Sequence, residues 1–379
     1  MCDSLWGRDM KEVHQSSSKL GTVVACQANY YQVRFWSEDT QEAPMYFLCT
    51  RRARLKKLGQ QVVVGDQVVV EELDWLARRG AIATVHPRIN LLDRPPVSNV
   101  DQILLVFAIA EPQLDPVQLS RFLVKAESTG IPVNLCLNKR DLLSEAELTQ
   151  WQTRLRGWGY EPILLSVRED KHLPSALMNT LNQRVSVVAG PSGVGKSSLL
   201  NRLVPDAEAR TNAVSGKLGR GRHTTRHVEL FDLPSGGLLA DTPGFNQPEV
   251  TCSVETLMQC FPEIRQRAGR CQFNDCVHRD EPGCSVRGDW ERYSHYLSLL
   301  DEVMNYQQQQ GHRPDEEAVE KVKMGSDGQI LHEPKLEAKK YRRKSRRQKH
   351  QDLQDMCYDV MGADSIDDLD DAVLEEYGF

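Results

Sequence analysis

The sequence predicts a multidomain protein with an N-terminal β-barrel, a central α/β domain and a C-terminal, mostly helical domain that binds a metal. Three observations lead to this fold class. Short β-rich runs fill residues 20–90, apolar strands alternate with helical periods between 96 and 248, and cysteines cluster with a histidine after residue 270. A chain of 379 residues has the length for several domains with buried cores.

The N-terminal domain, placed at residues 1–95, is predicted to be a small barrel. Gly65-Asp66 interrupts an apolar run and indicates a turn or bulge. About five strands in roughly 70 residues favour an OB-fold. Basic residues are dense at 51–57 and 78–79, which suits either solvated loops or a face that binds nucleic acid. The predicted strands are Leu20–Cys26, Tyr30–Trp36, Met45–Cys49, Gln61–Leu73 and Ala81–Val85.

The central domain, placed at residues 96–248, alternates buried strands with helices. Two segments have helical periodicity, Pro116–Ser128 and Glu145–Gly157. Such alternation is typical of a mostly parallel sheet that is covered on both faces. The predicted strands are Ile103–Ala110, Val133–Leu137, Ile163–Ser166, Val185–Ala189, Val228–Phe231 and Leu238–Ala240.

A phosphate-binding loop follows the fourth of these strands. The segment 190–198 matches the pattern GxxxxGK[ST] and leads into a predicted helix. Its glycines let backbone N–H groups surround phosphates, Lys196 would supply a catalytic charge to the β- and γ-phosphates, and the Ser197 hydroxyl would ligate Mg²⁺. The predicted nucleotide contacts are Gly190, Pro191, Ser192, Gly193, Val194, Gly195, Lys196, Ser197 and Ser198.

The tetrapeptide Asn138-Lys139-Arg140-Asp141 predicts that the nucleotide carries guanine. It follows the buried strand that ends at Leu137. Asp141 would accept hydrogen bonds from N1–H and the exocyclic amine of guanine, Asn138 would contact its N7/O6 side, and the Lys139 stem would pack along the ring. Adenine offers no matching pair of donors, so the carboxylate would be left unpaired at a cost of roughly 1–3 kcal/mol.

Two further elements would complete the magnesium and γ-phosphate site. Asp241 and Gly244 match a DxxG element, in which the carboxylate holds Mg²⁺ through water and the glycine N–H senses the γ-phosphate. The loop 219–225 contains Thr224 and Thr225, either of which would complete the Mg²⁺ shell as in a switch I loop. Ser166-Val167 lies where a loop that backs the base is expected.

The order of these motifs is circularly permuted. Ordinary GTPases run from the phosphate loop through switch I and DxxG to NKxD and the base loop, whereas here NKxD and the base loop come first. The central domain is therefore predicted to be an α/β P-loop GTPase domain with circularly permuted topology. As a consequence, DxxG runs directly into the C-terminal domain, so the nucleotide state can be transmitted along the chain.

No motif identifies the residue that activates water. Phe245 occupies the position after DxxG at which Ras-like enzymes carry a water-orienting glutamine. Intrinsic hydrolysis is therefore expected to be slow and to need a partner or another residue. His223, beside the switch threonines, is the preferred candidate for positioning or deprotonating water, with Gln247 as another. The alternative is a loop histidine that packs or binds an RNA phosphate.

The C-terminal domain, placed at residues 249–310, carries a C-x4-C-x-H-x5-C motif and a helical segment at 290–306. Three thiolates and one imidazole within 14 residues form a closed tetrahedral set suited to structural Zn²⁺, with no position left for a catalytic water. Cys252 and Cys260 are nearby alternative ligands, and free buried cysteines are the alternative interpretation. The predicted ligands are Cys271, Cys276, His278 and Cys284.

Together these motifs resemble the family of bacterial circularly permuted GTPases that depend on the small (30S) ribosomal subunit. The similarity spans about residues 18–300 and includes Pro95–Asp101, NKRD, GPSGVGKSS, GRGRHTT, DTPGF and the cysteine–histidine cluster. The resemblance implies an OB-fold, a permuted G domain and a zinc domain. It also implies 30S-stimulated GTP hydrolysis, a late role in 30S maturation, and contacts with 16S rRNA through the barrel and the zinc domain. His223 falls on the switch I histidine proposed as catalytic in this family. Phe245 agrees with the apolar residue that the family carries directly after DxxG.

The tail, residues 311–379, departs from the family pattern. Residues 335–349 carry nine Lys or Arg and one Glu, and residues 351–379 carry ten Asp or Glu and no Lys or Arg. We expect disorder here, as for the glutamines at 307–310. The basic block would bind rRNA phosphates with salt-dependent affinity, and the acidic end would limit nonspecific binding. A solvated tail without such a role fits the composition equally well.

The composition argues against membranes and secretion. No run approaches the roughly 20 apolar residues that span a bilayer, and the N-terminus lacks a basic region followed by an apolar run. We therefore expect a cytoplasmic monomer that binds GTP or GDP and no membrane. Two other functions remain open. One is a permuted GTPase that serves the large subunit or another ribonucleoprotein, and the other is a nonenzymatic RNA-binding regulator that senses guanine nucleotides.

Overall fold

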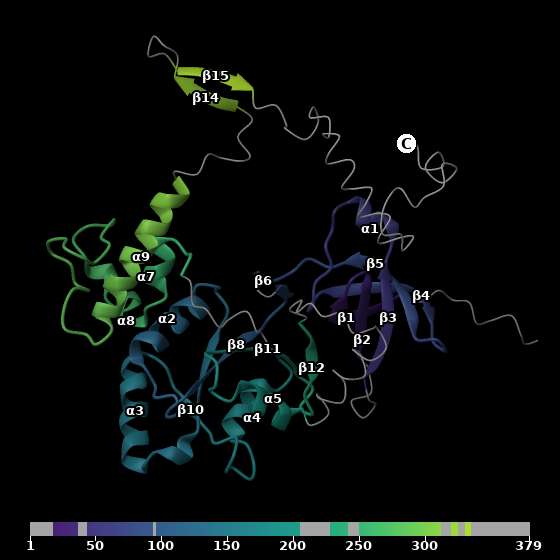
Figure 1. Ribbon diagram of the computed structural model, residues 1–379, viewed down its shortest axis with the longest axis horizontal. Coiled ribbons are helices and arrows are strands. Elements are labelled where there is room, and N and C mark those ends of the chain that lie inside the picture. The colour runs from purple at the N-terminus through teal and green to yellow at the C-terminus, as the bar shows by residue number, and fades with distance from the viewer. Residues whose placement is uncertain are drawn as a thin grey trace, which may run out of the picture. The chain divides into compact units, whose positions relative to one another are not determined.

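The computed structural model describes most of the chain between residues 18 and 334. The described residues are 18–36, 44–93, 96–204, 228–241, 250–311, 320–324 and 330–334. Met1–Gln309 form one compact unit and Gln310–Phe379 a second (Figure 1). None of the described helices is long and apolar enough to cross a membrane.

Five strands close into a barrel in the order β1-β2-β3-β5-β4, which confirms the predicted N-terminal barrel. Alternate side chains point inward, and Phe35 packs edge-on against Phe47 in the barrel core with ring centroids 5.0 Å apart. The short helix α1 (Ala53–Lys57) follows β3 in the chain. The strands are β1 Lys19–Gln27, β2 Tyr30–Phe35, β3 Met45–Arg51, β4 Gln67–Asp74 and β5 Arg79–Val85.

The fourth strand starts at Gln67 and not at Gln61, because the chain turns at Gly65 with a φ of +91°. The buried Asp66 carboxylate follows this turn and accepts hydrogen bonds from Arg88 Nε and from Ser98 Oγ, both at 2.7 Å. Ser98 ends the hairpin of β6 (Leu91–Asp93) and β7 (Pro96–Ser98), which leads into the central domain. Asp66 therefore ties the barrel to the entry of that domain.

The central domain contains a six-stranded sheet in the order β10-β9-β8-β11-β13-β12. All neighbours pair in parallel except β12 and β13, so the predicted mostly parallel sheet is confirmed. The strands are β8 Gln102–Ala108, β9 Val133–Asn138, β10 Ile163–Leu164, β11 Val185–Ala189, β12 Leu230–Asp232 and β13 Leu238–Asp241.

Helices cover both faces of this sheet because the side chains of its central strand alternate between two apolar cores. Leu105 of β8 belongs to a core with α2 (Pro116–Glu127) and α3 (Glu145–Gly157). Its neighbour Leu104 belongs to a second core with α4 (Ser175–Leu181) and α5 (Lys196–Leu203). Helix α4 is not predicted by the sequence, since seven residues are too few for a clear helical period.

The C-terminal part of the first unit is a helical module, as predicted. It contains α7 (Val254–Gln259), α8 (Pro262–Arg265) and α9 (Tyr293–Gly311). The module packs on α2 of the central domain, where Arg121 donates to Glu302 at 2.6 and 2.9 Å. Ser120 Oγ and His295 Nδ1 lie 2.8 Å apart in the same contact.

One prediction of disorder was wrong. Helix α9 continues through the glutamines at 307–310, because its backbone hydrogen bonds are local and glutamine is a good helix former. In the second unit, β14 (Glu320–Met324) and β15 (Ile330–Pro334) pair as antiparallel strands within the segment predicted to be a disordered tail. Disorder in the rest of that tail stays a prediction. The basic and acidic blocks lie outside the described residues.

Candidate nucleotide site and metal centre

The nucleotide motifs meet at one edge of the central sheet, despite their permuted order. Strand β9 ends at Asn138, the phosphate loop follows β11, and β13 ends at Asp241, whose backbone pairs beside Val188 of β11. Carboxyl ends of parallel strands lie at the same edge, which is where open α/β sheets bind ligands. The permutation therefore changes the connections between the strands and still brings these three segments to the same edge of the sheet.

Asn138 joins three of the predicted motifs. Its side chain is only 3% exposed. The amide Nδ2 donates to the backbone oxygen of Val194 in the phosphate loop at 2.8 Å, and the Oδ1 atom accepts from Val167 N in the base loop at 3.0 Å. The close packing explains the glycine at 195, because a Cβ there would lie 2.4 Å from the Asn138 amide nitrogen.

The backbone turns at Lys139, directly after the end of β9. Lys139 has a φ of +63°, and its Nζ donates to Gly193 O of the phosphate loop at 3.2 Å and to Glu111 O. The single turn Arg140–Leu142 that follows leaves the Asp141 side chain exposed. The carboxylate predicted to read guanine is therefore accessible to a base that enters from solvent.

The phosphate loop has the backbone geometry that its glycines suggest. Gly190 has a φ of +139°, and a Cβ there would lie 2.0 Å from Val106 O, so a side chain is excluded. Lys196 begins α5, and its Nζ donates to Gly190 O at 2.8 Å and to Pro191 O at 2.6 Å. The lysine thus lies across the loop that is expected to hold the phosphates.

The remaining residues of the loop differ in burial. Val194 is buried, which anchors the loop in the second sheet core. Three serines of the loop and of the first turn of α5 are exposed, so their hydroxyls are accessible: Ser192, Ser197 and Ser198.

Several predicted residues cannot be placed in this site. His223, Thr224 and Thr225 lie outside the described residues, as do Gly244, Phe245 and Gln247. Asp241 is described only through its backbone as the last residue of β13. The assignments of the water-activating residue and of the magnesium ligands therefore stay predictions.

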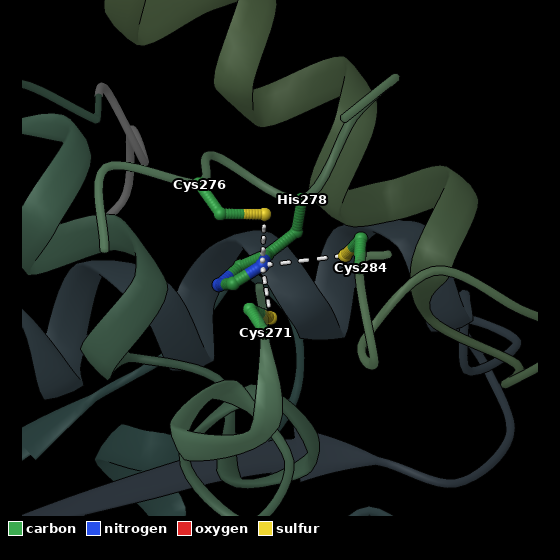
Figure 2. Close-up of side chains that lie close together, drawn as sticks. All are labelled: Cys271, Cys276, His278 and Cys284. Atoms are coloured by element: carbon green, nitrogen blue, oxygen red, sulfur yellow. Dashed lines mark hydrogen bonds between the residues drawn. The ribbon is translucent and has the colours of Figure 1, made fainter. Parts of the chain in front are cut away.

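The four predicted metal ligands come together in the C-terminal module (Figure 2). His278 Nδ1 lies 3.6 Å from Cys271 Sγ, 3.3 Å from Cys276 Sγ and 3.6 Å from Cys284 Sγ. All four ligand atoms lie within 4.8 Å of one another. A tetrahedral zinc ion with ordinary bond lengths separates sulfur and nitrogen ligands by about 3.5 Å, so the cluster has the size of a metal site.

The loop that carries these ligands is held by side chains that the sequence analysis missed. The Glu281 carboxylate accepts from Val277 N and from Arg279 N, both at 2.8 Å. From α9, Tyr293 Oη donates to His278 O at 2.9 Å. No spacing rule identifies such supporting groups, because the fold alone brings α9 against the loop.

Burial keeps His278 available as a ligand. Desolvation lowers the pKa of the imidazole, although the nearby Glu281 carboxylate opposes the shift. The neutral form, which retains a lone pair for a metal, is therefore favoured at neutral pH. The alternative ligands Cys252 and Cys260 are not part of the cluster, and Cys260 Sγ donates instead to Thr256 O at 3.1 Å.

Known proteins with similar sequences extend over nearly the whole chain. The RsgA GTPase family profile matches residues 85–251. The "Small ribosomal subunit biogenesis GTPase RsgA" of Trichormus variabilis is 56% identical over 91% of this chain and 98% of its own length. The mitochondrial relative "Small ribosomal subunit biogenesis GTPase RsgA 1" of Arabidopsis thaliana is 43% identical over 89% of this chain and 86% of its own length.

Solved structures agree with this assignment. The circularly permuted GTPase YloQ superimposes with a TM-score of 0.65 at 32% identity, covering 78% of this chain and 98% of that one. YjeQ from Thermotoga maritima gives a TM-score of 0.63 at 30% identity, covering 76% of this chain and 99% of that one. The barrel, the permuted sheet and the cysteine–histidine module are thus accompanied by close sequence similarity, and the chain belongs to the RsgA GTPase family.

Proposed function

We propose that this chain hydrolyses GTP to GDP and phosphate while bound to the small ribosomal subunit and assists late 30S maturation. The observation that carries the proposal is the junction at Asn138, where one buried side chain joins the guanine motif, the phosphate loop and the base loop. The names of the curated relatives, which state biogenesis of the small ribosomal subunit, support the assignment to 30S.

In the proposed complex, Asp141 reads the guanine edge and Lys196 neutralises the β- and γ-phosphates. The exposed Asp141 carboxylate and the position of Lys196 across the phosphate loop support these roles. Mg²⁺ bound with GTP supplies charge neutralisation at the transferred phosphate. Its proposed ligands are Ser197, either Thr224 or Thr225, and, through water, Asp241.

The cysteine–histidine cluster is proposed to hold one structural Zn²⁺. Three sulfur donors and one imidazole are a donor set that zinc prefers, and the spacing of the ligand atoms supports it. Zinc bound there would hold together the loop that carries the four ligands.

The metal module is proposed to respond to the nucleotide. The DxxG element leaves β13 at Asp241, and nine residues later Val250 is buried in the core of the metal module. A change of conformation between these points would be transmitted directly to the module. The barrel and the module are proposed to contact 16S rRNA, with the chain acting as a cytoplasmic monomer. The proposed domain bounds are 1–95, 96–248, 249–310 and 311–379.

We expect GTP turnover to be slow for the protein alone and to rise strongly with purified 30S subunits. The test measures phosphate release with the protein alone, with 30S and with 50S, and uses subunits alone as the background. Stimulation by 50S in preference to 30S would contradict the proposed partner. Nucleotide binding without turnover under any condition would instead indicate a GTP-sensing binding protein.

Replacing His223 with alanine is expected to leave GTP affinity unchanged and to lower 30S-stimulated turnover by about 10²-fold or more. A residue that positions or deprotonates water contributes about this much to the rate. Single-turnover hydrolysis with saturating 30S separates chemistry from product release. Full retention of the stimulated rate would make His223 a loop residue without a catalytic role.

A further inference from the structure

The base loop, residues 166–170, is closed by hydrogen bonds among its own residues. Ser166 N donates to Asp170 Oδ2 at 2.8 Å, and Asp170 N donates to Ser166 O at 3.1 Å. The Ser166 hydroxyl is buried and accepts from Glu169 N at 3.0 Å. The conformation of the loop therefore depends on the position of Asp170.

Two arginines hold this loop from outside, and each belongs to a different nucleotide motif. Arg140, the variable residue of the guanine tetrapeptide, binds the Asp170 carboxylate with its Nη2 atom 2.7 Å from Oδ1. Arg202 lies on α5, the helix that follows the phosphate loop. Its guanidinium donates to the backbone oxygens of Val167 and Asp170.

The Asp170 carboxylate is bonded both within the loop and to Arg140. Burial alone would raise its pKa, but the Ser166 N–H and the Arg140 guanidinium outweigh burial, and the net pKa is lowered. The group is therefore ionised at neutral pH. Arg140, the third residue of the predicted guanine tetrapeptide, donates to Asp170 of this loop.

We infer that Arg202 and Arg140 are positioning residues for guanine recognition. Resting on the proposed GTP site, we place their effect at Asn138: they hold the loop 166–170 where Val167 N donates to Asn138 Oδ1, and so orient the side chain expected to contact the N7/O6 side of guanine. Arg202 thereby connects the phosphate-binding helix with the loop that orients Asn138. Since the loop is held before the nucleotide arrives, binding does not have to order it.

The diphosphates of guanosine, inosine and adenosine (GDP, IDP and ADP) separate the contribution of this loop to nucleotide affinity from that of Asp141. GDP and IDP share the C6 oxygen, whereas only GDP carries the exocyclic amine that Asp141 would bind. If the loop orients Asn138 toward the C6 oxygen, it contributes equally to GDP and IDP binding and not to ADP binding. Loss of the Asp141 contact instead changes the ratio of GDP to IDP affinity.

We expect Arg202→Ala to weaken GDP and IDP binding by the same factor of about tenfold or more and to leave ADP binding unchanged. Arg202→Lys should recover only part of this loss, because an ammonium lacks the planar fork that reaches two carbonyls. In 30S-stimulated turnover, KM for GTP should rise while kcat at saturating GTP stays the same. Competition titrations against a fluorescent GDP analogue measure the affinities.

Arg156→Ala is the matched control, because Arg156 forms an exposed pair with Glu161 at 2.7 Å on α3, away from the nucleotide motifs. It should leave all three affinities unchanged. Unchanged GDP affinity in folded Arg202→Ala and Arg202→Lys proteins would overturn the inference. A lowered ratio of GDP to IDP affinity would overturn it too, because Arg202 would then act through Asp141. A wild-type protein that binds ADP as tightly as GDP would refute the proposed GTP site itself.

Discussion

Replacing Lys196 with alanine is expected to lower the affinity for GTP by about a hundredfold or more. The ammonium can donate to both the β- and the γ-phosphate, and each hydrogen bond to a charged group contributes about 1.5–3 kcal/mol. Two such bonds correspond to a loss of about two to four powers of ten in affinity. Titration with a fluorescent GTP analogue measures the effect.

The loss should depend on the length of the phosphate chain. GMP lacks both phosphates that Lys196 would contact, so its affinity should be the same for wild type and variant. The variant should remain folded, because the hydrogen bonds that it loses to Gly190 O and Pro191 O lie within the phosphate loop, where Lys196 Nζ donates to both. Equal losses for GMP and GTP would mean that Lys196 supports the loop and does not bind the phosphates.

Removal of the metal, by chelation or by Cys276→Ser, is expected to unfold the C-terminal module. Structural zinc contributes about 10–16 kcal/mol of apparent binding free energy in small zinc domains at pH 7, which exceeds any single contact in the module. Trp290 packs against Tyr293 with ring centroids 5.5 Å apart, so its fluorescence and near-ultraviolet circular dichroism report the loss. Metal analysis should find one zinc per wild-type chain and much less in the variant.

Cys260→Ser is the matched control in the same module. Cys260 is buried but lies outside the cluster, and a serine hydroxyl can also donate to Thr256 O. This variant should retain its zinc and its thermal unfolding temperature to within a few degrees. Loss of zinc from it, or a module that stays folded after chelation, would contradict the assigned ligand set.

The sequence alone predicted the elements whose signals are local. Apolar runs placed the strands of the central sheet, since burial on both faces demands continuous apolar residues. Short β-rich runs placed those of the barrel, where alternate side chains point inward. Helices α2 and α3 of the central domain begin and end close to the predicted residues because each has a clear period and a capping side chain. The metal ligands were likewise predicted, since four ligands within 14 residues need little help from the rest of the fold.

Only the tertiary structure decided how distant segments cooperate. Asn138 meets Val194 and Val167 across gaps of 56 and 29 residues, and no pattern in the chain shows which of its two amide atoms serves which motif. The contact of Arg202 with the base loop likewise joins residues that are far apart in the sequence, so only the fold reveals it. The sequence predicted a guanine site and a metal site, because those chemistries require residue types at short spacing. The order of the strands in the sheet determined which side chains hold the guanine site together, because contacts between strands depend on three-dimensional packing.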